Sequence, residues 1–304
     1  MARISAHILG TLEIESALGR CELPGSSKAQ ELLCYLLLHR NRPVPRSTLA
    51  CVLWADLEIS RALKQLRQAL WQLQSTVGRV NEWWFEITPR SVTIRAHPEF
   101  WLDIAEFEGI FERVRGPASH PLSLEDAATA DRAITLYRGD LLDGYDFDWC
   151  IVEREWFQSA YLSLLDRMMV HCEAVGEYEL GVDYGERILR VDRAREYTHR
   201  RLMYLHALIG NRTGALRQYR RCVAALNEEL DVLPTRSTVL LWEQIRAGVE
   251  VERRSNPLKT GSQALGGAPT SSLSERIRRV QRALGDVQLQ IQAEFLGLES
   301  EAPQ

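Results

Sequence analysis

One segment of the chain, residues 59–77, carries side chains that suit the recognition of a polyanion. Its apolar residues recur at three- and four-residue spacing and predict one buried helical face, formed by Leu63, Leu66, Leu70, Leu73 and Val77. The opposite face carries only cationic and amide side chains, and residues 60–80 contain no aspartate or glutamate. Arginine and lysine pair with guanine, and glutamine pairs with adenine, in the major groove of duplex DNA. The segment therefore predicts a DNA-reading face, whose candidate base contacts are Arg61, Lys64, Gln65 and Gln68.

Four further cations are candidates for phosphate or groove contacts. Arg67 lies at the edge of the apolar face, where a phosphate is the expected partner. Lys28 and Arg46 stand near the starts of two earlier helical segments, so each can hold a phosphate together with the backbone amides there. Arg90 lies in a predicted hairpin turn and is a candidate for the minor groove. For each of these cations the alternative is a solvated surface charge.

The order of elements around this segment is that of a winged helix-turn-helix. Alternating apolar residues predict a strand over residues 3–14, with Gly10 at a bulge or bend. Three helices and a hairpin are then predicted at residues 28–40, 46–54, 59–77 and 84–95. In a winged helix the third helix enters the major groove, and the hairpin reaches the adjacent backbone or minor groove. The alternative is a small α+β domain whose basic helix face is only solvated.

Residues from 103 to about 250 show almost no strand pattern, so we expect an all-α domain. Two similar stretches that begin at Gly176 and Gly210 are offset by 34 residues, which is the period of the tetratricopeptide repeat. The match is partial, because Met169 and Met203 stand where the first helix of such a repeat usually has glycine. We therefore predict divergent repeats that stack into a short solenoid, with a concave face that suits a partner.

An arginine-rich stretch interrupts the otherwise acidic second part of the chain. Residues 187–221 contain ten arginines against Asp192 and Glu196. A solvated helix surface is one interpretation. The alternatives are a docking surface for RNA polymerase, an additional phosphate contact, or a pocket for a small anionic effector such as a cyclic dinucleotide. The candidate residues are Arg187, Arg190, Arg193, Arg200, Arg201, Arg217, Arg220 and Arg221.

The last fifty residues combine a linker composition with a heptad pattern. Residues 252–272 are rich in glycine, serine and proline and predict a flexible linker. Residues 273–299 predict an amphipathic helix whose seam suits a dimerisation coiled coil, with Ile277, Val280, Leu284, Val287 and Ile291 along it. Docking of this helix onto the helical repeats of its own chain is the competing interpretation. A homodimer would match an operator with two half-sites.

Composition and missing motifs exclude other classes of function. The 304 residues are 45% hydrophobic and 26% charged, which is typical of about two globular domains. The longest apolar run, residues 32–38, is far shorter than the roughly 18 residues of a membrane span, and no signal peptide opens the sequence. Six scattered cysteines predict reduced core thiols and a cytoplasmic protein. Because no catalytic motif and no metal-ligand cluster is found, we expect no enzyme activity, no cofactor and no metal.

Charge is distributed unevenly between the two parts. The net charge of the whole chain is −4, which alone argues against an acidic partner. Residues 1–100, however, hold 12 lysines and arginines against 9 aspartates and glutamates, a balance of +3. The two parts are therefore expected to have different partners.

Short motifs follow one another in a characteristic order from residue 5 to about 248. In the first part they are LGTLEI at 9–14, LLLHRNRPV at 36–44, VLW at 52–54 and LRQAL at 66–70. In the second part they are WLD at 101–103, LYRGDLL at 136–142 and ALRQY at 215–219. This series resembles the antibiotic regulatory protein type of bacterial transcriptional activator, in which an OmpR-like winged helix precedes a bacterial transcriptional activation domain.

The resemblance implies a fold, a domain division and a function. The fold is an α+β winged helix-turn-helix at 1–98, an all-α tetratricopeptide-like domain at 99–251 and the C-terminal amphipathic helix. The function is activation of transcription, with double-stranded DNA containing a repeated operator and RNA polymerase holoenzyme as partners, and no membrane. The third helix departs from the family, because Gln72 and Gln74 replace two usual arginines and remove two phosphate contacts. The alternative function is a non-enzymatic tetratricopeptide scaffold whose winged helix binds protein.

Overall fold

The structure is a computed structural model that describes residues 4–16, 19–76, 85–95, 97, 99–116 and 120–249. These residues belong to one unit, Met1–Val251, and a second unit comprises Glu252–Gln304. Val77, the predicted linker and the predicted dimer helix lie outside the described residues. Within the described ranges, each helix is too short or too polar to span a membrane.

The N-terminal sheet combines a hairpin with a strand from much later in the chain. β1 (Ile4–His7) pairs antiparallel with β2 (Glu13–Ser16), and β2 pairs with β3 (Gly19–Arg20). β7 (Phe100–Leu102) lies parallel to β1, which gives the strand order β3-β2-β1-β7. The single strand predicted over residues 3–14 is therefore a hairpin, and Gly10 has a φ of +116° in its turn.

Three helices and a second sheet form the winged helix. The helices are α1 (Ser27–Leu38), α2 (Arg46–Leu53) and α3 (Ile59–Thr76), each within two residues of its predicted bounds. The predicted hairpin consists of β5 (Phe85–Ile87) and β6 (Ser91–Ile94), and β4 (Val44–Pro45) pairs with β6 on its other side. The order β4-β6-β5 places the wing next to the start of α2, because Pro45 immediately precedes that helix.

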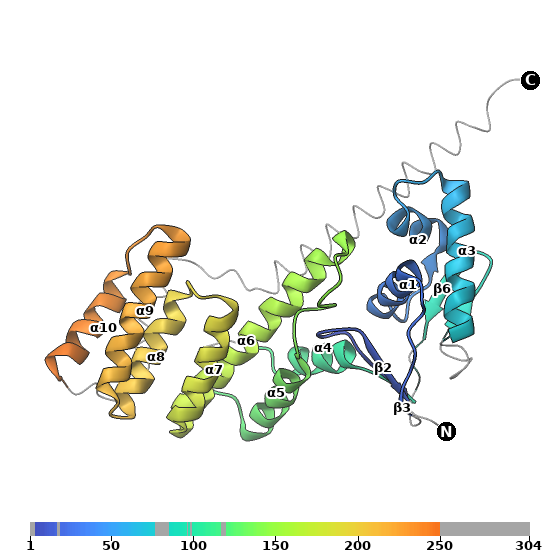
Figure 1. The fold of residues 1–304 in the computed structure, drawn as a ribbon. Helices are drawn as coiled ribbons and strands as arrows, with labels where there is room; N and C mark the ends of the chain where they lie inside the picture. Colours follow the sequence, from blue (N-terminus) through green and yellow to red (C-terminus); the bar gives the residue numbers. More distant parts are fainter. Residues whose placement is uncertain are drawn as a thin grey trace, which may run out of the picture. The chain divides into compact units, whose positions relative to one another are not determined.

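The rest of the described chain is helical. Its elements are α4 (Asp103–Arg113), α5 (Leu124–Leu136), a short η1 (Asp148–Cys150), α6 (Ile151–Val175), α7 (Tyr178–Val191), α8 (Glu196–Leu208), α9 (Arg212–Leu230) and α10 (Arg236–Ala247). From α4 to α10, helices that are neighbours in sequence pack side by side, as in helical repeats (Figure 1). Gly176 and Gly210 end α6 and α8 with φ of +88° and +80°, a backbone conformation that glycine adopts without strain. The predicted tetratricopeptide-like arrangement is thus confirmed.

A glycine in α7 shows how the repeat accommodates the large side chain of Met169. A Cβ atom on Gly185 would lie 2.6 Å from Cδ2 of Leu202 and 2.8 Å from Cε of Met169. Helix α7 therefore packs closely against α6 and α8 at Gly185. In the usual repeat, a glycine in the first helix allows this close contact. Here a glycine in the second helix allows it.

The winged helix and the helical repeats share one hydrophobic core. Asp103, fully buried at the start of α4, accepts hydrogen bonds from the backbone N–H groups of Ile8 (2.7 Å) and Leu9 (2.8 Å). The backbone N–H of Gly10 donates to the carbonyl of Asp140 at 3.1 Å. The motifs LGTLEI and LYRGDLL thus hold each other in place.

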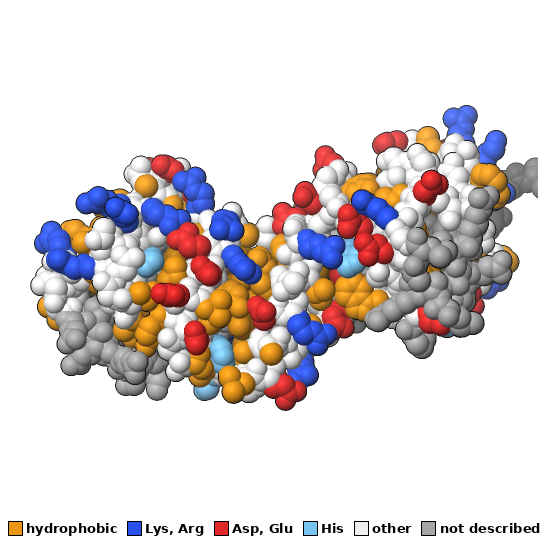
Figure 2. Space-filling model, turned by 60° about the horizontal axis from the view of Figure 1, so that its bottom comes forward, with side chains coloured by type: hydrophobic (Ala, Val, Ile, Leu, Met, Phe, Trp, Pro, Cys, Tyr) orange, Lys and Arg blue, Asp and Glu red, His pale blue; other side chains and the backbone are white. Residues whose placement is uncertain are grey.

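Most of the cysteines are buried thiols, as predicted. Cys34, Cys150 and Cys172 belong to this core, Cys222 is buried elsewhere, and Cys21 and Cys51 are half-buried. Burial raises the pKa of Cys150 and of Cys172 to about 11, so both remain protonated at neutral pH. Elsewhere charged and apolar side chains are interspersed over the surface (Figure 2).

Candidate nucleic-acid interface

The exposed face of α3 carries the residues predicted to contact bases. Arg61, Lys64, Gln65 and Gln68 are all exposed, as is Arg67. The opposite face is buried through Ala62, Leu66, Ala69, Leu70 and Leu73. Ala62 and Ala69 were not predicted in the core, because short side chains do not stand out in a leucine pattern. Among the described residues, no carboxylate forms an ion pair with the three cations of α3.

The start of α3 has a carboxylate that is engaged by the helix itself. Glu58 accepts a hydrogen bond from the backbone N–H of Ser60 at 3.1 Å and another from the Ser60 hydroxyl. These bonds hold the pKa of Glu58 below its usual range, so the group is ionised at neutral pH. Glu58 thereby stabilises the positive end of the helix. It precedes the helix, and the nearby charge of Arg61 contributes to lowering its pKa.

Arg46 and Arg90 come together beside the wing. Pro45 pairs with Ser91, and the backbone N–H of Arg46 donates to the carbonyl of Arg90 at 2.9 Å. Arg90 is exposed, whereas the Nε of Arg46 is buried and has no hydrogen-bond partner among the described residues. The N-terminus of α2 has no side-chain capping bond. Two arginines beside the start of a helix suit a phosphate.

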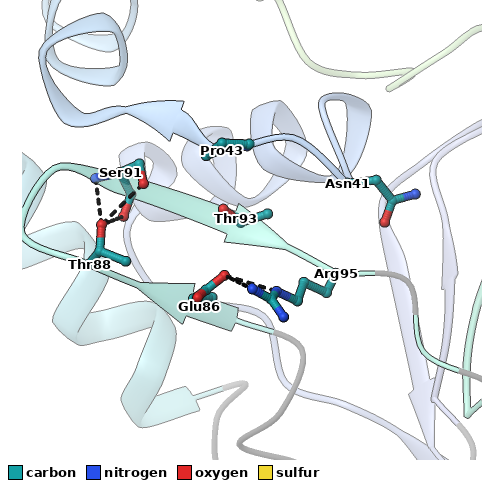
Figure 3. A pocket seen from close by; sticks show the side chains of 7 residues that line it. All are labelled: Asn41, Pro43, Glu86, Thr88, Ser91, Thr93 and Arg95. Atoms are coloured by element: carbon teal, nitrogen blue, oxygen red, sulfur yellow. Dashed lines mark hydrogen bonds and ion pairs between the residues drawn. The ribbon is translucent and has the colours of Figure 1, made fainter.

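A hollow beside the wing shows how the hairpin turn is held (Figure 3). Its volume is about 580 Å³, and it is lined by Asn41, Pro43, Glu86, Thr88, Ser91, Thr93 and Arg95. Arg95 and Glu86 form an ion pair of 2.5 Å between the two strands. The hydroxyl of Thr88 accepts from the backbone N–H of Ser91 at 2.9 Å and contacts the Ser91 hydroxyl at 3.1 Å. These bonds stiffen the turn that presents Arg90.

Lys28 is held in contacts within the winged helix. Its Nζ donates to the carbonyl of Leu53 at 2.6 Å and pairs with Glu31 at 2.8 Å. It also lies 5.9 Å from the centre of the Trp54 ring. Lys28 thus connects the start of α1 with the end of α2, and the structure does not place it beside Arg46 and Arg90.

One exposed residue of α3, an aromatic one, is absent from the predicted DNA contacts. Trp71 lies one turn beyond Gln68, and 67% of its surface is exposed. Residue spacing could have predicted this exposure, because Trp71 lies outside the buried leucine stripe and on the same stripe as Lys64 and Gln68.

The arginine-rich stretch divides into paired and unpaired side chains. Ion pairs join Arg193 to Glu228, Arg195 to Asp166, Arg201 to Glu173, and Arg221 to Glu186. Arg201 is buried, Arg200 donates to the Ser237 hydroxyl at 3.0 Å, and Arg187 stacks on the Tyr184 ring. Figure 2 shows cationic side chains at the end of the view that holds α8 to α10, with carboxylates beside them. Within the described ranges, Arg190, Arg217 and Arg220 are exposed and have no such partner.

Of the two histidines of α8, His199 lies in the interior of the repeats and His206 is half-buried. His199 is buried, and its ring nitrogens lie 2.8 Å from the carbonyl of Arg193 and 2.7 Å from Nε2 of Gln218. Burial lowers the pKa of His199 and of His206, so both are neutral at pH 7. No group of three metal-ligating side chains gathers anywhere in the described part of the chain.

Comparison with known proteins identifies the family of the helical domain. Residues 102–246 match the family model of the bacterial transcriptional activator domain. The structure is similar to that of Mycobacterium tuberculosis EmbR in complex with a low-affinity phosphopeptide, with a TM-score of 0.58 and 19% sequence identity. The similarity covers 82% of this chain and 66% of the EmbR chain, so this chain spans slightly less than two thirds of that length. No protein of curated function matches the sequence. The domain match confirms the bacterial transcriptional activation domain that the ordered motifs indicate. The shared fold confirms the predicted architecture.

Proposed function

We propose that this chain binds duplex DNA sequence-specifically. Its bacterial transcriptional activator domain follows a winged helix. This is the domain order of the antibiotic regulatory protein type of activator. One observation carries the proposal. The exposed face of α3 presents Arg61, Lys64 and Arg67 with glutamines between them and no carboxylate. Cations supply the attraction to phosphates, and glutamines and arginines read base edges.

The wing supplies the second contact in this proposal. Arg46 and Arg90 lie together at one corner, next to the uncapped start of α2. In a winged helix bound to DNA, such a corner faces the backbone next to the groove that holds the third helix. Phosphate contacts there would set the position of α3 without reading sequence.

Selection from random duplexes with the purified protein tests this function. We expect an enriched motif and an affinity that falls steeply between low and moderate salt. Arg67→Ala and Arg90→Ala should each reduce the slope of log affinity against log salt by about one if the side chain contacts a phosphate. Arg236→Ala, an exposed arginine of α10, is the matched control and should leave the slope unchanged. Failure to enrich any motif would favour the alternative, a repeat scaffold whose winged helix binds protein.

The helical repeats provide the contact with RNA polymerase holoenzyme in this proposal. Arg190, Arg217 and Arg220 are exposed cations without carboxylate partners in the described ranges, so they suit an acidic surface. Replacing all three with alanine should abolish activation in a reconstituted transcription reaction and leave DNA affinity intact. Activation that survives the triple change would overturn this assignment.

A small anionic effector is the alternative ligand for these arginines. A cyclic dinucleotide added to the purified protein should then raise its melting temperature, and the triple alanine variant should lose that shift.

Homodimerisation through residues 273–299 completes the proposal, because two winged helices match two half-sites. Sedimentation of the full chain and of a version ending at residue 251 would test it, since only the full chain should dimerise.

A further inference from the structure

We propose that Trp71 reads a thymine in the DNA site through the 5-methyl group of that base. The proposal rests on the DNA binding proposed above and adds to it one specificity-determining residue. Trp71 would be the apolar member of a face whose other members are cations and amides.

The exposure of Trp71 is unusual within α3. Leu66, Leu70 and Leu73 are each no more than 3% exposed, whereas Trp71 is 67% exposed. Ile59, the first residue of the helix, is the next most exposed of its large apolar side chains at 40%. A bare indole surface in water is unfavourable, because burying apolar surface stabilises by about 25 cal/mol per Å². A partner that covers Trp71 would recover this energy.

The position of Trp71 aligns it with the predicted base contacts. Lys64, Gln68 and Trp71 follow one another at spacings of four and three residues, so they form one stripe along the helix. Seven residues separate Lys64 from Trp71, which corresponds to about 10 Å along the helix axis. Base pairs in a duplex are about 3.4 Å apart, so Trp71 would lie about three base pairs from the contact of Lys64.

The surroundings of Trp71 favour DNA over an apolar protein surface as the partner. Its neighbours on the exposed side are Arg67, Gln68, Gln72 and Gln74, and no carboxylate lies on the helix. A docking surface for an apolar protein face would need several exposed apolar neighbours. In the major groove, the 5-methyl group of thymine is the apolar feature that side chains contact. A single aromatic residue among cations and amides matches such a groove.

Replacing thymine with deoxyuridine removes only this methyl group and so tests the proposal directly. Each thymine of the selected operator is replaced in turn, and the affinities of the wild-type protein and of Trp71→Ala are measured. One replacement in each half-site should weaken wild-type binding about fourfold, the value of one buried methyl group. Trp71→Ala should bind the thymine duplex and the deoxyuridine duplex equally. Gln74→Ala, which changes a neighbouring exposed residue, should retain the fourfold difference.

Three outcomes separate the proposal from its alternatives. Equal weakening of Trp71→Ala on every duplex, with the deoxyuridine effect retained, would overturn it and indicate a contact with the sugar-phosphate backbone. Wild-type binding that no deoxyuridine replacement affects would overturn it as well, while the proposed function would stand. If the wild-type protein selects no sequence, the proposed function itself fails. Melting of Trp71→Ala at the wild-type temperature would show that the variant is folded, as its exposure leads us to expect.

Discussion

The indole Nε1 of Trp149 donates a hydrogen bond of 3.0 Å to Oε1 of Glu31, and this bond links the helical repeats to the first helix of the winged helix. Glu31 is buried, and its other oxygen pairs with Lys28 at 2.8 Å. Trp149 also contacts the edge of the Tyr35 ring, with the ring centres 5.0 Å apart. Lys28, which was predicted to hold a phosphate, is thus part of the contact between the two regions.

Removal of the indole donor should destabilise the protein. Trp149→Phe retains an aromatic ring and leaves Oε1 of the buried Glu31 without its donor. We expect the free energy of unfolding to fall by about 1–3 kcal/mol, measured by urea denaturation. Trp71→Phe, at an exposed tryptophan, should change it by less than about 0.5 kcal/mol. Equal effects of the two changes would contradict a structural role for the Trp149–Glu31 bond.

Replacement of the Asp103 carboxylate should destabilise the folded protein. Its Oδ2 accepts from Ile8 and Leu9, and its Oδ1 accepts from the backbone N–H of Ile104 at 2.7 Å. In Asp103→Asn, an NH₂ group would face at least one of these donors, so unfolding should become easier by about 1–3 kcal/mol. Asp183→Asn, at an exposed aspartate of α7, is the control and should have little effect. A silent Asp103→Asn would show that the amide is accommodated by rearrangement.

The close approach at Gly185 predicts opposite effects for two glycine-to-alanine changes in helices. Gly185→Ala would place a methyl group against Leu202 and Met169, and overpacking of this kind costs about 1–3 kcal/mol. Gly109 of α4 is exposed, and a Cβ there meets nothing within 4 Å. Gly109→Ala should therefore stabilise the protein by about 0.5–1 kcal/mol through helix propensity. Thermal unfolding of both variants checks the difference in sign.

His39 should make the stability depend on pH below about 6.5. Burial, together with the nearby charge of Arg42, lowers the pKa of His39 from 6.5 to about 3. Between these values the unfolded chain binds a proton that the folded chain does not, so stability falls as the pH falls, by up to about 1.4 kcal/mol per unit. His39→Gln should lack this component when unfolding is measured from pH 7 to pH 4. Parallel curves for the two proteins would contradict it.

Much of the fold could be predicted because its signals are local. The bounds of α1, α2 and α3 follow from apolar spacing and from Pro43 and Pro45. The 34-residue offset of Gly176 and Gly210 reflects two helix ends with a left-handed residue. By contrast, β7 was not predicted as part of the first sheet, because its pairing with β1 joins residues nearly one hundred positions apart. A strand of three residues carries almost no periodicity of its own.

The sequence by itself determined which helices form and that α3 bears an acid-free face, since backbone geometry converts residue spacing directly into a buried and an exposed side. Only the tertiary structure decided how those charges are used. Arg221 meets Glu186 and Arg193 meets Glu228 across 35 residues, while Arg190 and Arg217 have no such partner in the described ranges. Lys28 is engaged by Leu53 and Glu31. The physical reason is that long, flexible charged side chains pair with whatever the packed helices bring near them, and this packing depends on contacts between distant residues.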